Sequence, residues 1–321
     1  MIREKDGIHI ELENKYVVDS RNSTGDSTIV SHAHMDHVHS GGNRVIASEL
    51  TAKLASSRLN EEIDTEENEK IKLIDSGHIL GSSSVLIEDN GERVLYTGDV
   101  SLQDRAYIEG FDPVKADKLI VESTYGIPAY RLPEQKEIEK QIQEWIQDTK
   151  STPYLFGYSL GKAQKIQYII QKVTDKPIVA HGSVMKMNRV VEEHTELNFD
   201  ALQYGENKDL LKNGEAIFIG PTNFSNTDAL KKLVDQSNGV KAGFSGWGVQ
   251  DSYKYRGGYD KVFPLSDHCG FDDLVELVNR VDPEKVYTHH GFDSEFASHL
   301  KKEHGYNARS LKENQSSLTD F

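Results

Sequence analysis

Short apolar runs alternate with amphipathic stretches along the whole chain, which is typical of a layered α/β protein. Near the N-terminus apolar residues occupy every second position, at Ile8, Ile10 and Leu12, as in a strand with one buried face. Asn90-Gly91 separates two β-rich runs and predicts a two-residue hairpin turn, because both residues tolerate positive φ angles. In this first part we expect strands at 8–12, 16–19, 28–31, 85–88, 93–96 and 118–121, and a helix at 49–59.

From about residue 150 the pattern changes to short strands separated by helical stretches, as in a parallel α/β domain. Pro133 predicts the start of a helix that runs to about residue 148. The expected strands that follow are 154–156, 178–180, 216–219 and 240–244, with helices beginning near 161, 183 and 226. The earlier pattern then resumes with a strand ending at 264, a helix at 271–281, a strand at 285–288 and a helix from 294. We therefore expect a discontinuous first domain, residues 1–128 and 262–321, with an inserted α/β domain at 129–261.

The formal net charge of −15 argues against a broad basic surface of the kind that binds duplex nucleic acid without sequence preference. Contact with phosphate must therefore be local, and bound divalent cations are one local source of positive charge. The sequence has no apolar run of about 18 residues and no secretion signal at its start. We expect a cytoplasmic protein without a membrane segment, in which Cys269, the only cysteine, fills the core.

The most concentrated chemistry is the HxHxDH run of residues 32–37, which follows a predicted strand. Its candidate ligands are His32, His34, Asp36 and His37. Imidazole and carboxylate suit zinc, manganese or iron, and the lack of ligand cysteines argues against a closed structural zinc site. The alternative is a chance cluster of surface histidines.

Further candidate ligands recur at predicted strand ends, and they disfavour chance clustering. These are His78 in SGHILGS, Asp99 in YTGDVS and His290 in YTHHGF, each beside or near a glycine that permits close backbone approach. Taken singly, each would more often be a structural polar residue at a turn. Together the candidates are numerous enough to hold two ions.

The ordered series HxHxDH, GHxLGS and TGD resembles the metallo-β-lactamase superfamily. The resemblance implies an αββα sandwich that holds two divalent metal ions, zinc or manganese. It also implies that Asp19 orients the ligands and that Asp36 and Asp99 take part in catalysis as ligands. By this resemblance one ion is held by His32, His34 and His78, and the other by Asp36, His37 and His290, with Asp99 bridging them.

Three later motifs resemble, in order, those of the β-CASP nucleases, which carry an inserted α/β domain. Glu122 lies in the first (ESTY), His268 in the second (SDH) and His290 in the third (THHG). The resemblance implies that His268 protonates the leaving oxygen while Glu122 holds its ring. The alternative is that His268 only caps the helix expected at 271–281.

Five segments, two of which contain the ESTY and SDH motifs, resemble bacterial and archaeal exonucleases associated with DNA ligase, and short archaeal homologues of the mRNA 3′-end processing nuclease. They are ESTYGIPAYRLP, LFGYSLGKAQKI, IVAHGSVMKMN, FSGWGVQ and PLSDHCGF. Lys162, at a helix start after Ser159, predicts an anion site, although an ordinary helix start with a solvated lysine is the alternative. The expected substrate contacts are Ser123, Thr124, Ser159, Lys162, His181, Ser245 and Trp247, whereas His39 and His289 are expected to be bystanders.

The first functional hypothesis is a metal-dependent nuclease acting on single-stranded nucleic acid. We expect a DNA exonuclease in end processing or repair, with DNA ligase or repair proteins as partners. The near alternative is processing of RNA 3′ ends. Two other classes are a small-molecule metallo-hydrolase, such as a lactamase or thioesterase, and an inactive scaffold that binds nucleic acid or protein.

Overall fold

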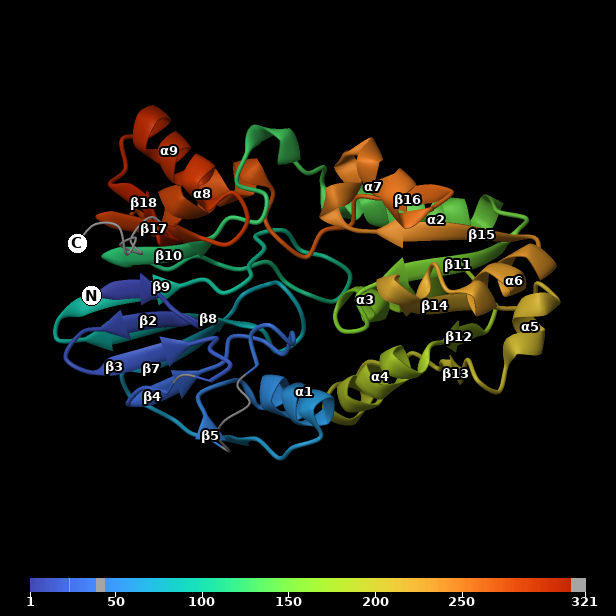
Figure 1. Cartoon of the computed structure of the whole chain (residues 1–321), viewed down its shortest axis with the longest axis horizontal. Helices are drawn as coiled ribbons and strands as arrows, with labels where there is room; N and C mark the ends of the chain where they lie inside the picture. Colours follow the sequence, from blue (N-terminus) through green and yellow to red (C-terminus); the bar gives the residue numbers. More distant parts are fainter. Residues whose placement is uncertain (23, 39–43, 313–321) are drawn as a thin grey trace. The chain divides into compact units, whose positions relative to one another are not determined.

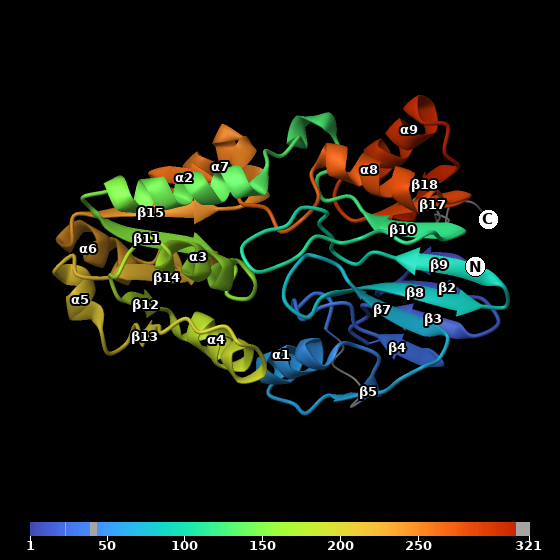
Figure 2. The same ribbon diagram turned by 180° about the vertical axis from the view of Figure 1, so that it is seen from behind.

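The computed structural model describes residues 1–22, 24–38 and 44–312. The chain forms two compact units, and the second is inserted into the first. Unit 1 contains Met1–Gln103, Glu109–Arg131 and the chain from His268 onward, whereas unit 2 contains Asp104–Ile108 and Leu132–Asp267. Figure 2 shows the blue N-terminal strands and the red C-terminal helices within the same unit. We expect domain boundaries after residues 128 and 261, and these positions stay a prediction. The chain passes from unit 1 to unit 2 after residue 131 and returns to unit 1 after residue 267.

The described part of unit 1 contains two large sheets, as expected for an αββα sandwich (Figure 1). The four-stranded sheet has the order β1-β2-β3-β4. Its strands are β1 (Ile2–Glu4), β2 (Ile8–Glu11), β3 (Lys15–Val18) and β4 (Ser27–Ile29). The six-stranded sheet has the order β18-β17-β10-β9-β8-β7. Its strands are β7 (Ile71–Asp75), β8 (Ser83–Asp89), β9 (Glu92–Tyr96), β10 (Lys118–Glu122), β17 (Lys285–His289) and β18 (Ala308–Ser310). A short pair, β5 (Arg44–Val45) and β6 (Asp64–Thr65), lies outside both sheets.

Alternation along the strands builds two cores in unit 1, because neighbouring side chains of a strand point to opposite faces. Val94 faces the four-stranded sheet and packs with Ile10 and Val18, whereas its neighbour Leu95 packs beneath the helices. The helices on this outer face are α8 (Phe271–Val281) and α9 (Asp293–Glu303). A third helix, α1 (Glu49–Leu59), begins at Ser48, whose side chain accepts a hydrogen bond from the backbone of Thr51.

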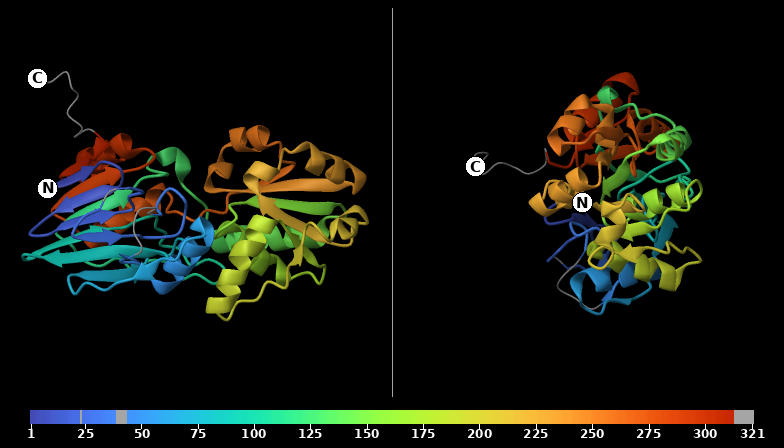
Figure 3. Two further views of the ribbon diagram at one scale, coloured as in Figure 1. Left: turned by 60° about the horizontal axis from the view of Figure 1, so that its bottom comes forward. Right: turned by 90° about the vertical axis from the view of Figure 1, so that its right-hand side faces the viewer.

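Unit 2 is a parallel sheet with helices on both faces, as the sequence pattern predicts (Figure 3). The strand order is β13-β12-β14-β11-β15-β16. Its strands are β11 (Thr152–Gly157), β12 (Ile178–Ala180), β13 (Leu202–Gln203), β14 (Ile217–Pro221), β15 (Gly239–Phe244) and β16 (Lys261–Phe263). Its helices are α2 (Gln135–Asp148), α3 (Lys162–Gln171), α4 (Gly182–His194), α5 (Lys208–Lys212), α6 (Asp228–Gln236) and α7 (Asp251–Gly257).

The two faces of this sheet pack separate cores. Ile217 and Ile219 of β14 pack with α2 and α3, whereas Phe218 between them packs with α5 and α6. Each fully buried aliphatic or aromatic side chain of this kind stabilises the fold by about 1.5–3 kcal/mol. None of the described helices in either unit is long and apolar enough to span a membrane.

Candidate metal centre and acid pair

Strand direction brings the candidate ligands of unit 1 to one edge of the six-stranded sheet. β10 is parallel to both β9 and β17. β7 and β9 are each antiparallel to β8 and therefore run the same way as each other. His78, Asp99, Glu122 and His290 all lie at or just beyond the carboxyl ends of these four strands. In open α/β sheets this edge is where ligands bind.

The HxHxDH run lies on the loop after β4 and is attached to the same edge. The backbone N–H of Ser83, at the start of β8, donates a 2.8 Å hydrogen bond to the carbonyl of Ser31. On the other side, Gly77 has a φ angle of +71°, and a Cβ there would lie 2.3 Å from the carbonyl oxygen of Ser101. Only glycine allows this close approach, which positions the following His78.

Four donor atoms meet at this edge with the spacing of a tetrahedral site. His34 Nδ1 lies 3.1 Å from His32 Nε2 and 3.2 Å from His78 Nε2. Asp99 Oδ2 lies 3.3 Å from His32 Nε2 and 3.5 Å from His78 Nε2. A tetrahedron around zinc, with bonds of 2.0–2.1 Å, has edges of about 3.3 Å. The donor set therefore fits a divalent cation in both geometry and chemistry.

Burial prepares these groups to bind a cation. It lowers the pKa of His32 and holds that of His78 well below its usual value, so both imidazoles are neutral at neutral pH. Burial raises the pKa of Asp99, but the nearby imidazoles of His268, His32 and His37 together hold it well below its usual range. Neutral imidazoles and an ionised carboxylate are the forms that bind metal.

A second group of donors is more open. His37 Nε2 lies 3.7 Å from Asp36 Oδ2 and 4.0 Å from Asp99 Oδ2. The Asp36 side chain is 59% exposed, and the ring of His290 lies 6.2 Å from that of His37. Among the described residues, His290 is not part of any group of three or more donors that lie within 4.8 Å of one another. The expected second ligands, Asp36, His37 and His290, thus lie in the same region, but their donor atoms are farther apart than those of the first set.

Asp19 lies behind both groups and is buried. Its backbone has a φ angle of +51°, and its Oδ2 accepts hydrogen bonds from His37 Nδ1 at 2.9 Å, Ser31 Oγ at 2.6 Å and the Tyr96 hydroxyl at 2.7 Å. Burial lowers the pKa of His37, but Asp19 and Asp99 raise it to about 10. The family resemblance predicts Asp19 at this position, whereas Ser31 and Tyr96 were not predicted, because serine and tyrosine in β-rich runs carry no distinctive signal.

The expected acid pair is formed. His268 Nδ1 lies 2.8 Å from Glu122 Oε1, and Glu122 is fully buried at the end of β10. The backbone N–H groups of Thr124 and Val100 donate to the same carboxylate at 3.0 and 3.3 Å. Burial raises the pKa of Glu122, but the contacts with His268 and Thr124 together outweigh burial, so the pKa lies below its usual value. The ring of His268 lies 4.7 Å from that of His78, which places the pair beside the tetrahedral group.

Two expected substrate contacts next to Glu122 differ in exposure. Ser123 is buried, and its hydroxyl donates to the backbone carbonyls of His289 at 2.9 Å and His290 at 2.6 Å. This favours a role in holding the turn after β17. Thr124 as a whole is only partly buried, but its hydroxyl oxygen is buried and makes no hydrogen bond to the described residues.

The expected contacts in unit 2 cluster at the carboxyl ends of its parallel strands. Ser159 follows β11, His181 follows β12, and Ser245 and Trp247 follow β15. Ser159 Oγ lies 2.8 Å from Ser183 Oγ, and Ser183 Oγ lies 2.9 Å from His181 Nδ1. Ser245 accepts a 3.3 Å hydrogen bond from the backbone of Trp247. These residues share one edge of the sheet, as ligand-contacting residues of such sheets do.

Lys162 does not present its ammonium to solvent. The residue is 2% exposed, and its Nζ lies 2.9 Å from Asp267 Oδ2 and 2.5 Å from the carbonyl oxygen of Leu265. Lys165 is also buried and pairs with the other oxygen of Asp267. Because its ammonium is buried against Asp267 and the Leu265 carbonyl, the arrangement favours a structural role for Lys162 over contact with phosphate.

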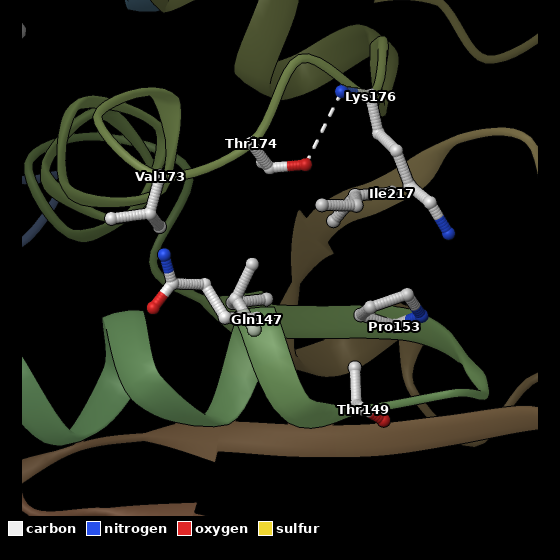
Figure 4. A pocket seen from close by; sticks show the side chains of 8 residues that line it. Gln147, Thr149, Pro153, Val173, Thr174, Lys176 and Ile217 are labelled. Atoms are coloured by element: carbon white, nitrogen blue, oxygen red, sulfur yellow. Dashed lines mark hydrogen bonds between the residues drawn. The ribbon is translucent and has the colours of Figure 1, made fainter.

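A pocket of about 240 Å³ in unit 2 lies away from these residues (Figure 4). It opens near the amino ends of β11 and β14, where Pro153 and Ile217 line it. Figure 4 shows the Thr174 hydroxyl accepting a 3.2 Å hydrogen bond from the backbone of Lys176 beside it. None of the expected site residues lines this pocket.

The two expected bystander histidines have different outcomes. His39 lies outside the described residues. His289 is buried and stacks on Tyr96 at a ring distance of 5.4 Å. Burial and the neighbouring His290 lower the pKa of His289 to about 4, so its ring is neutral at neutral pH.

Comparison with known proteins gives several relatives. Residues 261–311 match the family described as the Zn-dependent metallo-hydrolase RNA specificity domain. A protein of Opitutus terrae named probable DNA ligase is 31% identical over 86% of this chain and 28% of its own length. An RNase J-like protein of Methanocaldococcus jannaschii is 31% identical over 51% of this chain and 49% of its own length. The same organism's probable RNase MJ4 is 26% identical over 94% of this chain and 90% of its own length.

The chain spans about a quarter and a half, respectively, of the first two relatives. Among solved structures, a protein of unknown function from Enterococcus faecalis superposes with a TM-score of 0.57. That match covers 88% of this chain and 78% of the other at 13% identity, so it supports the fold alone.

Proposed function

We propose that this chain, which belongs to the β-CASP group of the metallo-β-lactamase superfamily, hydrolyses phosphodiester bonds of nucleic acid with two divalent metal ions. The observation that carries the proposal is the tetrahedral group of His32, His34, His78 and Asp99 beside the His268–Glu122 pair. A metal site next to a general acid is what phosphodiester hydrolysis requires.

In this proposal His32, His34 and His78 hold one ion, and Asp36, His37 and His290 hold the other. Asp99 is shared between them, since its Oδ2 lies within 4.0 Å of His32, His78 and His37. Zinc is the first candidate and manganese the second. When bound, such ions polarise a phosphate and lower the pKa of water near neutrality.

His268 then acts on the leaving group. A sugar alkoxide is a poor leaving group, and protonation by a positioned histidine removes this barrier. Glu122 accepts a hydrogen bond from Nδ1 and fixes the ring so that Nε2 is the nitrogen that can face the substrate. The two backbone N–H groups that donate to Glu122 keep its carboxylate in place.

DNA is the proposed substrate, in end processing or repair, because the relative named probable DNA ligase matches most of this chain. RNA is the second candidate, favoured by the match to the RNA specificity domain and by the two relatives named as RNases. A DNA ligase or another repair protein as partner belongs to the first version only.

The test uses end-labelled single-stranded DNA and RNA of equal length and sequence. We expect the zinc- or manganese-loaded protein to shorten the DNA strand, and the product ladder gives polarity and exonuclease or endonuclease mode. Cutting confined to RNA would replace the DNA version with the RNA version. Hydrolysis of a chromogenic β-lactam or a thioester, with neither strand cut, would overturn the nuclease proposal in favour of a small-molecule hydrolase.

Two substitutions separate metal binding from proton transfer. Asp99→Ala should lose activity together with bound metal, whereas His268→Ala should lower the rate by about 100- to 10,000-fold with metal content unchanged. His194→Ala is the matched control, because that histidine is exposed on α4. Full activity in His268→Ala would exclude it as proton donor, and a wild type that binds no divalent metal would support the inactive-scaffold alternative.

A further inference from the structure

The hydrogen bonds around Asp19 determine which ring nitrogens face the metal centre. Oδ1 of Asp19 accepts the backbone N–H of Ser31 at 2.7 Å, and Oδ2 accepts from Ser31 Oγ, His37 Nδ1 and the Tyr96 hydroxyl. Asp19, Ser31 and Tyr96 are all less than a tenth exposed. The carboxylate is therefore surrounded by donors and is held in one orientation.

Ser31 passes this constraint on to His32. The Ser31 hydroxyl has one hydrogen, and that hydrogen goes to Asp19 Oδ2 at 2.6 Å. Ser31 Oγ also lies 2.9 Å from His32 Nδ1, so this second contact has Oγ as the acceptor and Nδ1 as the donor. With the proton on Nδ1, Nε2 of His32 is left bare, and Nε2 is the atom that faces His34 and Asp99.

Tyr96 fixes the other side of the carboxylate. Its hydroxyl lies 2.7 Å from Asp19 Oδ2, and its ring is 1% exposed and stacks on His289. A tyrosine held in this way has little freedom to redirect its hydroxyl. It contacts none of the proposed ligands through a hydrogen bond among the described residues, so its effect on the centre passes through Asp19.

We propose that Ser31 and Tyr96 are positioning residues of the metal centre. Ser31 sets the Nδ1–H tautomer of His32, and Tyr96 fixes the Asp19 carboxylate on which both Ser31 and His37 depend. This inference rests on the metal site proposed above and extends it to two residues that bind neither metal nor substrate. Partners of this kind typically change metal affinity by about 10- to 100-fold when they are removed.

The tautomer can be measured without metal. Long-range ¹H–¹⁵N correlation spectra of the imidazoles, recorded on the metal-free full chain, distinguish Nδ1–H from Nε2–H. For the wild type we expect His32 in the Nδ1–H form, and in Ser31→Ala we expect a shift toward the Nε2–H form. A wild-type His32 protonated on Nε2 would overturn the role of Ser31 even if the variant failed to fold.

Zinc affinity, measured by competition with a chelator, gives the second readout. Ser31→Ala and Tyr96→Phe should each weaken binding by about 10- to 100-fold. Ser310→Ala is matched to the first, because this buried serine donates to Asp293 at 2.8 Å outside the centre. Tyr154→Phe is matched to the second, because it removes a buried hydroxyl that lies 2.8 Å from Ser237 in unit 2. The two controls should leave zinc affinity unchanged.

The outcomes separate this inference from the proposed function. If Ser31→Ala and Tyr96→Phe bind zinc as tightly as the wild type and fold normally, the positioning role is excluded while the nuclease proposal stands. If the wild type binds no zinc or manganese, the metal centre itself fails. In that case the tautomer measurement still decides whether Ser31 orients His32.

Discussion

At the scale of single residues, Asp89 at the end of β8 couples stability to acid. Its side chain is buried, and it accepts a 2.7 Å hydrogen bond from Lys70 and two from Asn14, at 3.0 and 3.2 Å. Burial raises the pKa of Asp89, but the Lys70 and Asn14 bonds outweigh burial and hold the pKa well below its usual range. The folded protein therefore binds a proton here less readily than the unfolded chain does.

The sign of the resulting pH dependence follows from this lowered pKa. The stabilisation is fully present above the unfolded pKa of about 3.9 and is lost as pH falls below it. We expect Asp89→Asn to lower the free energy of unfolding at pH 7, and the gap to the wild type to shrink between about pH 4 and pH 2. Urea unfolding of the metal-free protein at several pH values measures this gap.

Asp228→Asn is the control for this measurement, because the Asp228 side chain is 94% exposed in its contact with Lys231. It should change stability little at any pH. A gap between Asp89→Asn and the wild type that is equal at pH 7 and pH 3 would contradict the assigned role of Asp89.

Residue type and spacing gave the candidate ligands, and the family resemblance grouped them into sets. His32, His34, His78 and Asp99 were found because clustered imidazoles and carboxylates are rare unless they bind something. Ser31 was not found, because a serine at a strand end is common and acquires meaning only from the distances to its neighbours. Its role depends on three-dimensional contacts that local sequence does not contain.

Lys162 shows the opposite case at the same scale. A lysine at a helix start after a glycine suggests an anion site, yet the ammonium of Lys162 pairs with Asp267, about a hundred residues away in sequence. Lys165 pairs with the same carboxylate, so two buried lysines share one aspartate. Local sequence does not reveal a partner that comes near only in the folded unit.

At the scale of elements, a strong periodicity of apolar residues predicts the ends of a helix accurately. The predicted helices at 49–59 and 271–281 match α1 and α8 at both ends. In α8 the buried residues Leu274, Leu277, Val278 and Val281 recur at helical spacing, which leaves little freedom in placing the helix. The short elements α5 and β13 were missed, because five and two residues are too few to show a period.

The turn of the hairpin between β8 and β9 depends on the backbone conformation of Gly91. Asn90 and Gly91 have φ angles of +52° and +78°, as a type I′ turn requires. A Cβ at Gly91 would have nothing within 4 Å, so steric crowding by neighbours plays no part. The whole penalty of a side chain there comes from backbone conformation.

Gly91→Ala should therefore destabilise the protein by about 1 kcal/mol, through the positive φ angle alone. Thermal or urea unfolding measures the change. Gly205→Ala is the matched control, since Gly205 also has nothing within 4 Å but does not have a positive φ angle in the left-handed range. If both variants lose the same stability, the turn conformation is not the cause.

At the scale of the whole molecule, the net charge of −15 limits how the chain grips a polyanion. Each phosphate contact made by protein cations steepens the salt dependence of binding by about 0.7 in a log–log plot for single strands. With attraction confined to the metal centre, few contacts of this kind are expected. Salt also screens the long-range repulsion between the acidic protein and the strand. This screening favours binding as salt rises and therefore makes the salt dependence shallower.

We therefore expect a shallow salt dependence for single-strand binding, with a log–log slope no steeper than about −3. Fluorescence anisotropy of labelled DNA with His268→Ala loaded with zinc, between low and physiological salt, measures the slope without cutting. A slope near −6 would instead indicate an extended track of basic side chains and would contradict a grip centred on metal.

The fold class and the insertion were predictable from sequence at this scale, since the change from one strand pattern to the other is visible near residue 150. The compactness of the second ligand set was not predictable. Spacing cannot reveal that His290 has a φ angle of +64° and a ring 6.2 Å from that of His37. Such details depend on how two distant loops are positioned by the sheet.

The inserted topology also determines how the molecule would respond to pulling. Residues 1 and 312 both belong to unit 1, and unit 2 is attached only through internal positions of that unit. A stretching force applied at these two residues is carried first by the strands and helices of unit 1. Unit 2 comes under load only after unit 1 has yielded, so in an optical trap the sandwich would shield the inserted sheet from tension.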